Sequence, residues 1–167
     1  MEIARVAALG AATLTAGLVA GLFWGFGISV MPALRQTDDR TLIEVMQRIN
    51  RVILNGWFLL GYLGTALFTA LAAALTWFAP NPHPTPLPVT AALVVYLASL
   101  AVTGRINIPL NNALEAAGPP EHLTPAEATA LRTRFESPWT RANRVRTLLC
   151  TLTLALLTYS LLTETPL

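Results

Sequence analysis

The chain has 167 residues, of which 54% are hydrophobic and only 12% charged, and its formal net charge is +2. A soluble domain usually carries about a quarter charged residues, so this composition excludes an ordinary soluble domain and indicates a membrane protein. The basic residues are all arginines, and nearly all lie in the segments 35–51 and 105–146. Such clusters beside apolar stretches are typical of membrane flanks, so we expect no nucleic-acid partner.

Four apolar stretches are long enough for helices that cross a hydrocarbon core, which takes about 20 residues each. The fold class that this predicts is all-α, an integral membrane four-helix antiparallel bundle with short amphipathic cytoplasmic helices. The whole chain, 1–167, then forms one transmembrane domain. Its predicted spans are about 6–31, 53–78, 88–108 and 140–163.

The first span is far longer than the core of a signal peptide and has no convincing cleavage site, so we expect it to be retained. Within it, Gly17, Gly21 and Gly25 recur every four residues. Small residues at this spacing let another helix approach closely in lipid, either within the bundle or in a homo-oligomer. Pro32 is expected to end this span.

The segment between the first two spans begins with a helix start signal. Asp38 or Asp39 can cap an amphipathic helix over 41–50, since aspartate accepts a hydrogen bond from the free backbone N–H groups of a first turn. No helix-breaking residue separates this helix from span two. The two are therefore expected to form one rod of about 40 residues.

The two middle spans are separated by a proline-dense loop over 79–88 that contains His83. After span three, residues 116–120 form a second loop, and Thr124 with Glu127 makes a capping box for a cytoplasmic helix. Ser137-Pro138 repeats a start signal and is expected to begin span four. The lone cysteine, Cys150, excludes an internal disulfide and is expected to be a small buried apolar residue.

The arginine clusters predict the orientation in the cell inner (plasma) membrane. Arginines close to span ends are retained in the cytoplasm, which places both clusters inside. The proline-dense loop and the tail after span four contain no arginine or lysine. Both termini are therefore expected outside, with the lipid bilayer as the main environment.

Polar residues gather at the cytoplasmic ends of the spans, where such groups are candidate functional residues. They are predicted to form an amide-rich pocket: Asn50, Asn55, Asn107, Asn111, Trp139, Asn143 and Arg146. Trp139, Asn143 and Arg146 share one helical face because they are spaced by four and three residues. A helix-capping role for Asn107 and Asn111 remains open, and Arg141 and Arg144 are expected to reach lipid phosphates.

No sequence pattern predicts a cofactor. The two histidines, His83 and His122, lie on opposite sides of the predicted membrane, and no cluster of histidine, cysteine and carboxylate exists. A protein-bound catalytic metal is therefore not expected. Phosphate-binding glycine loops and Ser/His/Asp sets are also missing from the sequence.

Four motifs in order resemble the anthrone oxygenase family of small four-span proteins, and the resemblance covers nearly the whole chain. The motifs are 21–34 (GLFWGFGISVMPAL), 46–50 (MQRIN) followed by Trp57-Phe58, 107–111 (NIPLN), and Trp139-x3-Asn143-x2-Arg146-Thr147. Some members of that family are associated with oxidising an anthrone to an anthraquinone with O₂ and without a known cofactor. The resemblance implies such a substrate, a lipophilic aromatic small molecule.

The chemistry that the resemblance implies is compatible with these residues. Arg146 would stabilise an oxyanion on the substrate, helped by amide donors from Asn143, Asn107 and Asn111. Trp24, Trp57 or Trp139 would stack on the aromatic ring, with Asn50 also in the binding site. No general base is evident, and Glu115 is only a distant candidate.

Two further readings of the sequence stay open. The protein is either this oxygenase or a non-catalytic membrane protein, which would bind a hydrophobic small molecule or a lipid, or serve as a subunit of a membrane complex. A transporter is disfavoured because transporters place ionisable or unwound segments at mid-membrane, whereas the polar residues here lie at one end.

Overall fold

A computed structural model describes residues 1–79 and 86–164, and every regular element in that part of the chain is helical. The elements are α1 (Glu2–Gly25), η1 (Phe26–Val30), α2 (Met31–Arg35), α3 (Asp39–Ile53), α4 (Gly56–Trp77), α5 (Pro86–Val102), η2 (Thr103–Asn107), α6 (Ile108–Ala116), η3 (Pro120–His122) and α7 (Pro125–Glu164). Four continuous helical stretches are long and apolar enough to cross a membrane: 2–35, 56–77, 86–116 and 125–163.

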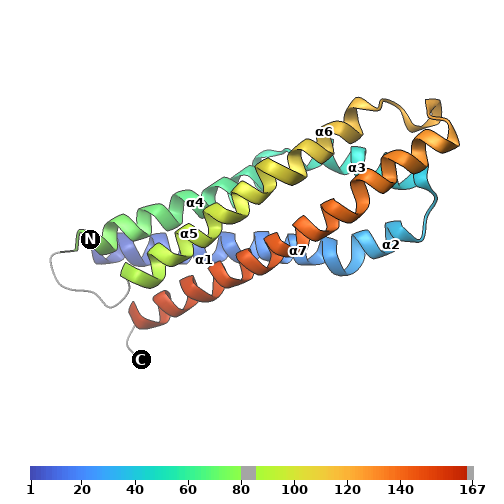
Figure 1. The fold of residues 1–167 in the computed structure, drawn as a ribbon. Helices are drawn as coiled ribbons and strands as arrows, with labels where there is room; N and C mark the ends of the chain where they lie inside the picture. Colours follow the sequence, from blue (N-terminus) through green and yellow to red (C-terminus); the bar gives the residue numbers. More distant parts are fainter. Residues whose placement is uncertain (80–85, 165–167) are drawn as a thin grey trace.

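The four long helices form the predicted antiparallel bundle (Figure 1). α1 packs along α4 and α7, and α5 packs along the same two helices, so each long helix contacts the spans before and after it in a closed ring. The start of α1 and the end of α7 lie at one end of the bundle, here named the termini end. The opposite end, here named the arginine-rich end, is formed by α2, α3, α6 and the start of α7.

The termini end is packed through small side chains. Its buried core consists mainly of alanines that bring the helices close together: Ala8, Leu9, Ala12, Ala16, Ala72, Ala73, Val89, Ala92 and Leu157. Close helix approach is the main source of attraction in lipid, where burial of apolar surface adds little. This half of the bundle therefore holds the four helices together.

Two π-helices interrupt the spans, one in each half of the chain. η1 directly precedes Met31-Pro32, and η2 directly precedes Ile108-Pro109. A proline inside a helix has no N–H for the carbonyl four residues earlier and its ring clashes with that carbonyl, so the preceding turn has to widen. Pro32 was expected to end span one, but the helix continues to Arg35 because the π-turn absorbs the proline.

The predicted rod that joins the amphipathic helix to span two is wrong. α3 ends at Ile53, and α4 starts at Gly56 after a bend at Leu54. Asn55 caps α4: its side-chain oxygen accepts a hydrogen bond from the backbone N–H of Phe58 at 3.1 Å. Its amide also donates to the Val52 carbonyl at 2.9 Å. The sequence prediction failed because it treated an asparagine that caps a new helix as a residue inside a continuing one.

The predicted start of span four at Ser137-Pro138 is also wrong. α7 is one helix from Pro125 to Glu164, with Pro138 inside it. Its start is the predicted capping box, in which the Thr124 N–H donates to Glu127 at 2.8 Å and the Glu127 N–H donates to the Thr124 hydroxyl at 3.3 Å. A helix of 40 residues is about 60 Å long, roughly twice the thickness of a hydrocarbon core. Its first part therefore extends beyond the bilayer, as does α6 beyond the predicted end of span three at 108.

Side chains from α3 and α7 close the arginine-rich end. Arg132 of α7 forms ion pairs with Asp39 (3.1 Å) and Glu136 (2.8 Å) and donates to the carbonyls of Arg35 and Thr37. The predicted cap of α3 is Asp38, which accepts from the Thr41 N–H at 3.0 Å. These contacts tie α2, α3 and α7 together outside the membrane core.

Two predictions about small residues have different outcomes. Cys150 is fully buried, as predicted. The glycine face of α1 packs on another helix only at Gly17, where an added methyl group would lie 3.8 Å from Leu154, whereas Gly21 and Gly25 face open space. Of the two roles that the sequence left open, a contact within the chain is found only at Gly17, and association of copies through this face stays a prediction. His83 and most of the proline-dense loop lie outside the described residues.

Candidate functional site

A cavity of about 230 Å³ lies inside the bundle towards its arginine-rich end, at the level of the two π-helices. Its wall, which is mostly apolar, is formed by α1, η1, α3, α4, η2, α6 and α7. Five of the predicted site residues line it together: Asn50, Asn107, Asn111, Trp139 and Arg146. Their grouping follows from the antiparallel topology, which brings the end of α3, η2, α6 and the middle of α7 to one depth.

Arg146 is the only charged residue that lines this cavity. It is 5% exposed and lies between two aromatic rings, with its guanidinium carbon 4.1 Å from the centre of the Phe23 ring and 5.5 Å from that of Trp139. No carboxylate of the described residues lies within ion-pair distance of it. A buried cation without a counter-ion is costly, so this arrangement favours an anionic or strongly polar ligand.

Asn143 fixes the orientation of the Arg146 side chain through a hydrogen bond. Its side-chain oxygen accepts a hydrogen bond from Arg146 Nη2 at 2.9 Å, and its amide donates to the Phe23 carbonyl at 2.8 Å. Asn143 is fully buried and does not line the cavity. Its position therefore fits an orienting role better than the direct oxyanion contact predicted from the sequence.

Several polar atoms at the cavity have no hydrogen-bond partner in the protein. Both side-chain atoms of Asn107, the amide nitrogen of Asn50 and the Nε of Arg146 are buried in this state. Buried polar groups are nearly always hydrogen-bonded, so an unpartnered group requires an explanation. Here the three side chains come from separate elements, η2, α3 and α7, and line one cavity. They offer hydrogen bonds to a ligand placed among them.

Aromatic side chains form much of the remaining wall. Phe23, Phe26, Phe58, Tyr62 and Trp139 all line the cavity. The Trp139 indole N–H donates to the side-chain oxygen of Asn111 at 2.8 Å, which fixes the ring. Phe58 stacks on Tyr62 with ring centres 5.2 Å apart and planes 12° apart. These rings form a surface suited to a flat aromatic ligand.

Two tryptophans predicted to stack on a ligand do not line the cavity. Trp24 is 59% exposed and lies in a shallow pocket beside Arg144 on the outer surface. Trp57 is 85% exposed and lines a different groove. Sequence reasoning instead missed Phe23, Phe26 and Tyr62. Neighbouring residues of a helix point in different directions, so Phe23 was the alternative to Trp24 as the aromatic side chain that faces the cavity.

No residue that lines the cavity is a carboxylate or a histidine. Glu115 lies in a neighbouring cleft that shares Asn50 and Asn111 with the cavity, and it forms an ion pair with Arg51 at 2.9 Å. Within the described residues, no three metal-binding side chains come together. The site as built thus offers one cation, several amides and aromatic rings.

These features define a small multi-pass membrane protein with an aromatic-lined cavity around a buried arginine. The family model of anthrone oxygenase matches residues 57–156, which is more than half of the chain. The chain therefore belongs to the anthrone oxygenase family. The match covers α4 to most of α7 and so includes Asn107, Asn111, Trp139 and Arg146, whereas the motifs of α1 and α3 lie outside it. No curated protein and no solved structure matches the chain.

Proposed function

We propose that the cavity binds a flat, phenolic, lipophilic aromatic of the anthrone type and that the protein oxidises it with O₂ to a quinone without a bound cofactor. The observation that carries this proposal is the buried Arg146, which has no carboxylate partner within the described chain and is enclosed by aromatic rings. Membership of the family supports the reaction class. The volume of about 230 Å³ suits a compact ring system better than a long-chain quinone, since pockets for drug-sized ligands usually exceed about 300 Å³.

The reaction needs only the substrate and O₂. Loss of a proton from the CH₂ carbon of an anthrone gives an anion that is spread over the rings and the ketone oxygen. This anion transfers one electron to O₂, and the resulting radical and superoxide combine to a peroxide anion at the same carbon. The peroxide anion takes up a proton from water, which replaces the one lost in the first step, and becomes a hydroperoxide. The hydroperoxide then loses water and becomes the second ketone. One anthrone and one O₂ thus give one quinone and one water.

The residues act on the anion and on its orientation. Arg146 stabilises the developing negative charge on the ketone oxygen, and Asn107 and Asn50 supply further donors to the substrate oxygens. Preorganised donors in a site without bulk water are the strongest means of stabilising an oxyanion. Trp139 and Phe23 hold the ring plane. With no base among the lining residues, water accepts the proton, and the cleft beside Glu115 gives it a route out.

We place the arginine-rich end in the cytoplasm and both termini outside, across a bacterial-type inner membrane. The exposed arginines at that end would otherwise have to cross the bilayer, which the positive-inside rule disfavours. The cavity then lies near the inner membrane face. Lipophilic substrates concentrate in that leaflet, and O₂ is more soluble there than in water.

The test is quinone formation after an O₂ pulse. Purified protein in detergent is mixed anaerobically with a dihydroxyanthrone and a metal chelator, O₂ is added, and absorbance of the quinone is followed. We expect a rate well above the spontaneous reaction for wild type and for Arg144→Gln, an exposed arginine on the same helix, and a rate near the spontaneous one for Arg146→Gln. Full turnover by Arg146→Gln would refute the proposed mechanism.

A second candidate function is binding without catalysis. It is favoured by the lack of a carboxylate or histidine among the residues that line the cavity. In that case the anthrone binds in an Arg146-dependent way, but quinone forms no faster than in protein-free detergent. The same experiment separates the two functions when quenching of protein fluorescence by the anthrone is measured in the anaerobic mixture, before O₂ is added.

A further inference from the structure

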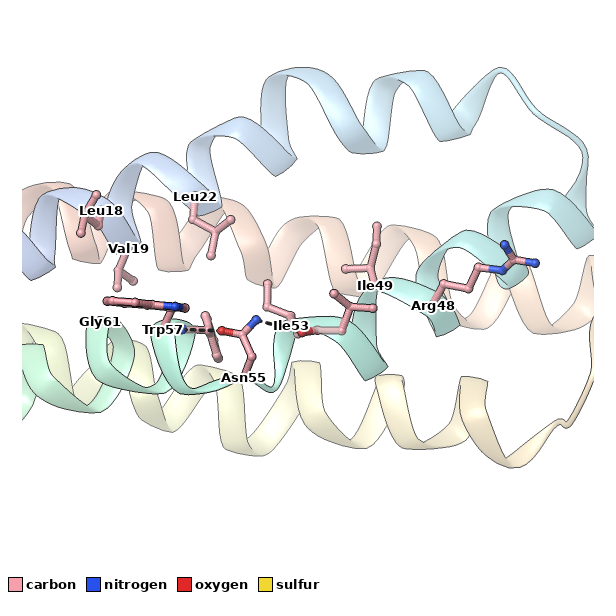
Figure 2. Close-up of a pocket in the computed structure, with 11 residues that line it drawn as sticks. Leu18, Val19, Leu22, Arg48, Ile49, Ile53, Asn55, Trp57 and Gly61 are labelled. Atoms are coloured by element: carbon pink, nitrogen blue, oxygen red, sulfur yellow. Dashed lines mark hydrogen bonds between the residues drawn. The ribbon is translucent and has the colours of Figure 1, made fainter.

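A wide groove opens on the outer surface between α1 and the corner where α3 meets α4. It has a volume of about 610 Å³, and its lining is almost entirely apolar. Figure 2 shows Leu18, Val19 and Leu22 reaching into it from α1, opposite Trp57 and Ile53. Arg48 lies at the far end, towards the arginine-rich end of the molecule. The cavity described above is smaller and more enclosed.

The groove and the cavity share part of their walls. Leu22, Ile49, Ile53 and Phe58 line both of them. Each of these four side chains is apolar, so it can change rotamer without breaking a side-chain hydrogen bond. The groove therefore borders the cavity along these residues.

The helix break at Leu54 and Asn55 creates this opening. α1 packs along α4, whereas α3, which precedes the bend, packs on α6 and α7, and within the described residues the groove lies between α1 and α3. Asn55 stabilises the bend through its two hydrogen bonds, to the Phe58 N–H and the Val52 carbonyl. A continuous rod, as expected from the sequence, would have kept α3 in line with α4. The break thus has a structural consequence at the place where the cavity needs access.

The lining fits an amphipathic aromatic that arrives from the bilayer. Trp57 is 85% exposed on the rim, and tryptophans on lipid-facing surfaces lie at the headgroup level. The polar residues of the groove are Asn55, whose side chain caps α4, and Arg48, which forms an ion pair with Glu44 and has further N–H groups for phenol oxygens. Leu18 and Val52, on opposite walls, are 64% and 73% exposed and give the rings an apolar surface.

We propose that this groove is the membrane-side entrance of the site, through which a flat phenolic aromatic passes from the inner leaflet into the cavity. The proposal rests on the proposed function, since it takes the ligand of the cavity to be such an aromatic. Phe58, Leu22 and Ile53 form the inner gate, and the ligand passes when their side chains rotate away. The occupant of the groove is the same compound in transit, with its rings on the apolar wall and its phenols towards Arg48.

The test compares variants that fill the groove with one that does not. Leu18→Trp and Val52→Trp add bulk on its two walls, whereas Leu14→Trp adds the same bulk one turn away on the same face of α1 and outside the groove. Leu14 is 67% exposed, which matches Leu18 closely. Protein in nanodiscs is mixed anaerobically with a dihydroxyanthraquinone, which cannot be oxidised, and quenching of protein fluorescence gives association and dissociation rate constants.

We expect the double variant Leu18→Trp with Val52→Trp to slow both rate constants by about tenfold while Kd stays within about threefold, because an obstructed entrance slows arrival and departure alike. Leu14→Trp should behave like wild type. Unchanged rate constants in the double variant would overturn the proposal, as would a failure of wild type to bind the probe. A tightly held phospholipid that the double variant loses, with unchanged ligand rates, would make the groove a lipid site instead.

These outcomes are separable from the fate of the proposed function. Binding and its rate constants are measured without O₂, so groove-dependent binding by a protein that makes no quinone refutes the oxygenase and keeps the entrance. If quinone forms but the groove substitutions leave the association and dissociation rate constants unchanged, the entrance is refuted and the oxygenase is kept.

Discussion

The two ends of the bundle satisfy their polar groups in different ways. At the termini end, buried hydroxyls bond to their own helix, as Thr69 does to the Thr65 carbonyl at 2.6 Å and Thr76 to the Ala72 carbonyl at 2.7 Å. The helices there meet through alanines. At the arginine-rich end, amide atoms of Asn50 and Asn107 face a cavity without a partner. One topology thus supplies a closed half that stabilises the bundle and an open half that can bind a ligand.

The largest effect should come from giving the unpaired cation a carboxylate. Thr103 lines the cavity, and its hydroxyl is 3.4 Å from Arg146 Nη1. Thr103→Asp should pair with the guanidinium and lower kcat/KM for a dihydroxyanthrone by about a hundredfold, the order of effect seen when one oxyanion donor is lost. Thr103→Asn has nearly the same shape without the charge and should lose far less. Equal losses in both variants would mean that the charge of Arg146 is not what matters.

The tight half should resist added volume more than the open half does. Ala12 is fully buried in the alanine-rich core, so Ala12→Leu should lower the free energy of unfolding by about 1–3 kcal/mol. Met46→Phe adds volume beside the cavity and should change it by less than about 1 kcal/mol. Thermal unfolding in one detergent measures both. A larger loss for Met46→Phe would contradict the assignment of spare volume to the arginine-rich end.

Two buried asparagines should respond in opposite directions. Asn107 has unpartnered side-chain atoms, so Asn107→Leu should raise the free energy of unfolding by about 1 kcal/mol while turnover falls. Both side-chain atoms of Asn143 are hydrogen-bonded, so Asn143→Leu should lower it by about 1–3 kcal/mol. The measurement is Tm of the two variants side by side. Destabilisation by Asn107→Leu would show that this side chain is structural.

The smallest effect concerns the cap of α3. Hydrogen bonds from the Thr41 hydroxyl and backbone N–H lower the pKa of Asp38 below its usual value. The folded-state pKa is below the unfolded one, so the stabilisation is fully present above the unfolded pKa and is lost as pH falls through the folded value. Protection factors for hydrogen exchange at the start of α3, which compare the observed rate with the intrinsic rate at the same pH, should therefore fall at acidic pH in wild type. Asp38→Ala should have low protection factors at all pH values, and wild-type protection factors that do not change with pH would contradict the cap.

The sequence predicted the features that depend on composition and periodicity. Four apolar stretches and two arginine clusters were enough for the bundle, and the common depth of Asn107, Trp139 and Arg146 was enough to group them. The spacing of Trp139, Asn143 and Arg146 also placed them on one face, and that face is where Arg146 meets Asn143.

The details that the sequence did not predict depend on packing in three dimensions. Asn55 caps a helix and Pro138 lies within one, although both residue types are compatible with either role. The π-turns before Pro32 and Pro109 rotate the residues that follow them about the helix axis, so the side chains there face directions that regular α-helical spacing does not predict. Trp24 was placed in the site, whereas its neighbour Phe23, which points in another direction from the same helix α1, lies there.

The central claim is that Arg146 stabilises a bound anion, and the most direct measurement is an anaerobic pH titration of a bound dihydroxyanthrone. The absorbance of the ligand reports its ionisation without any turnover. In wild type and in Arg144→Gln, the bound ligand should ionise at least about one pH unit below the free ligand, a shift worth about 1.4 kcal/mol. In Arg146→Gln this shift should disappear. A bound ligand that ionises at the same pH in all three proteins would contradict the account.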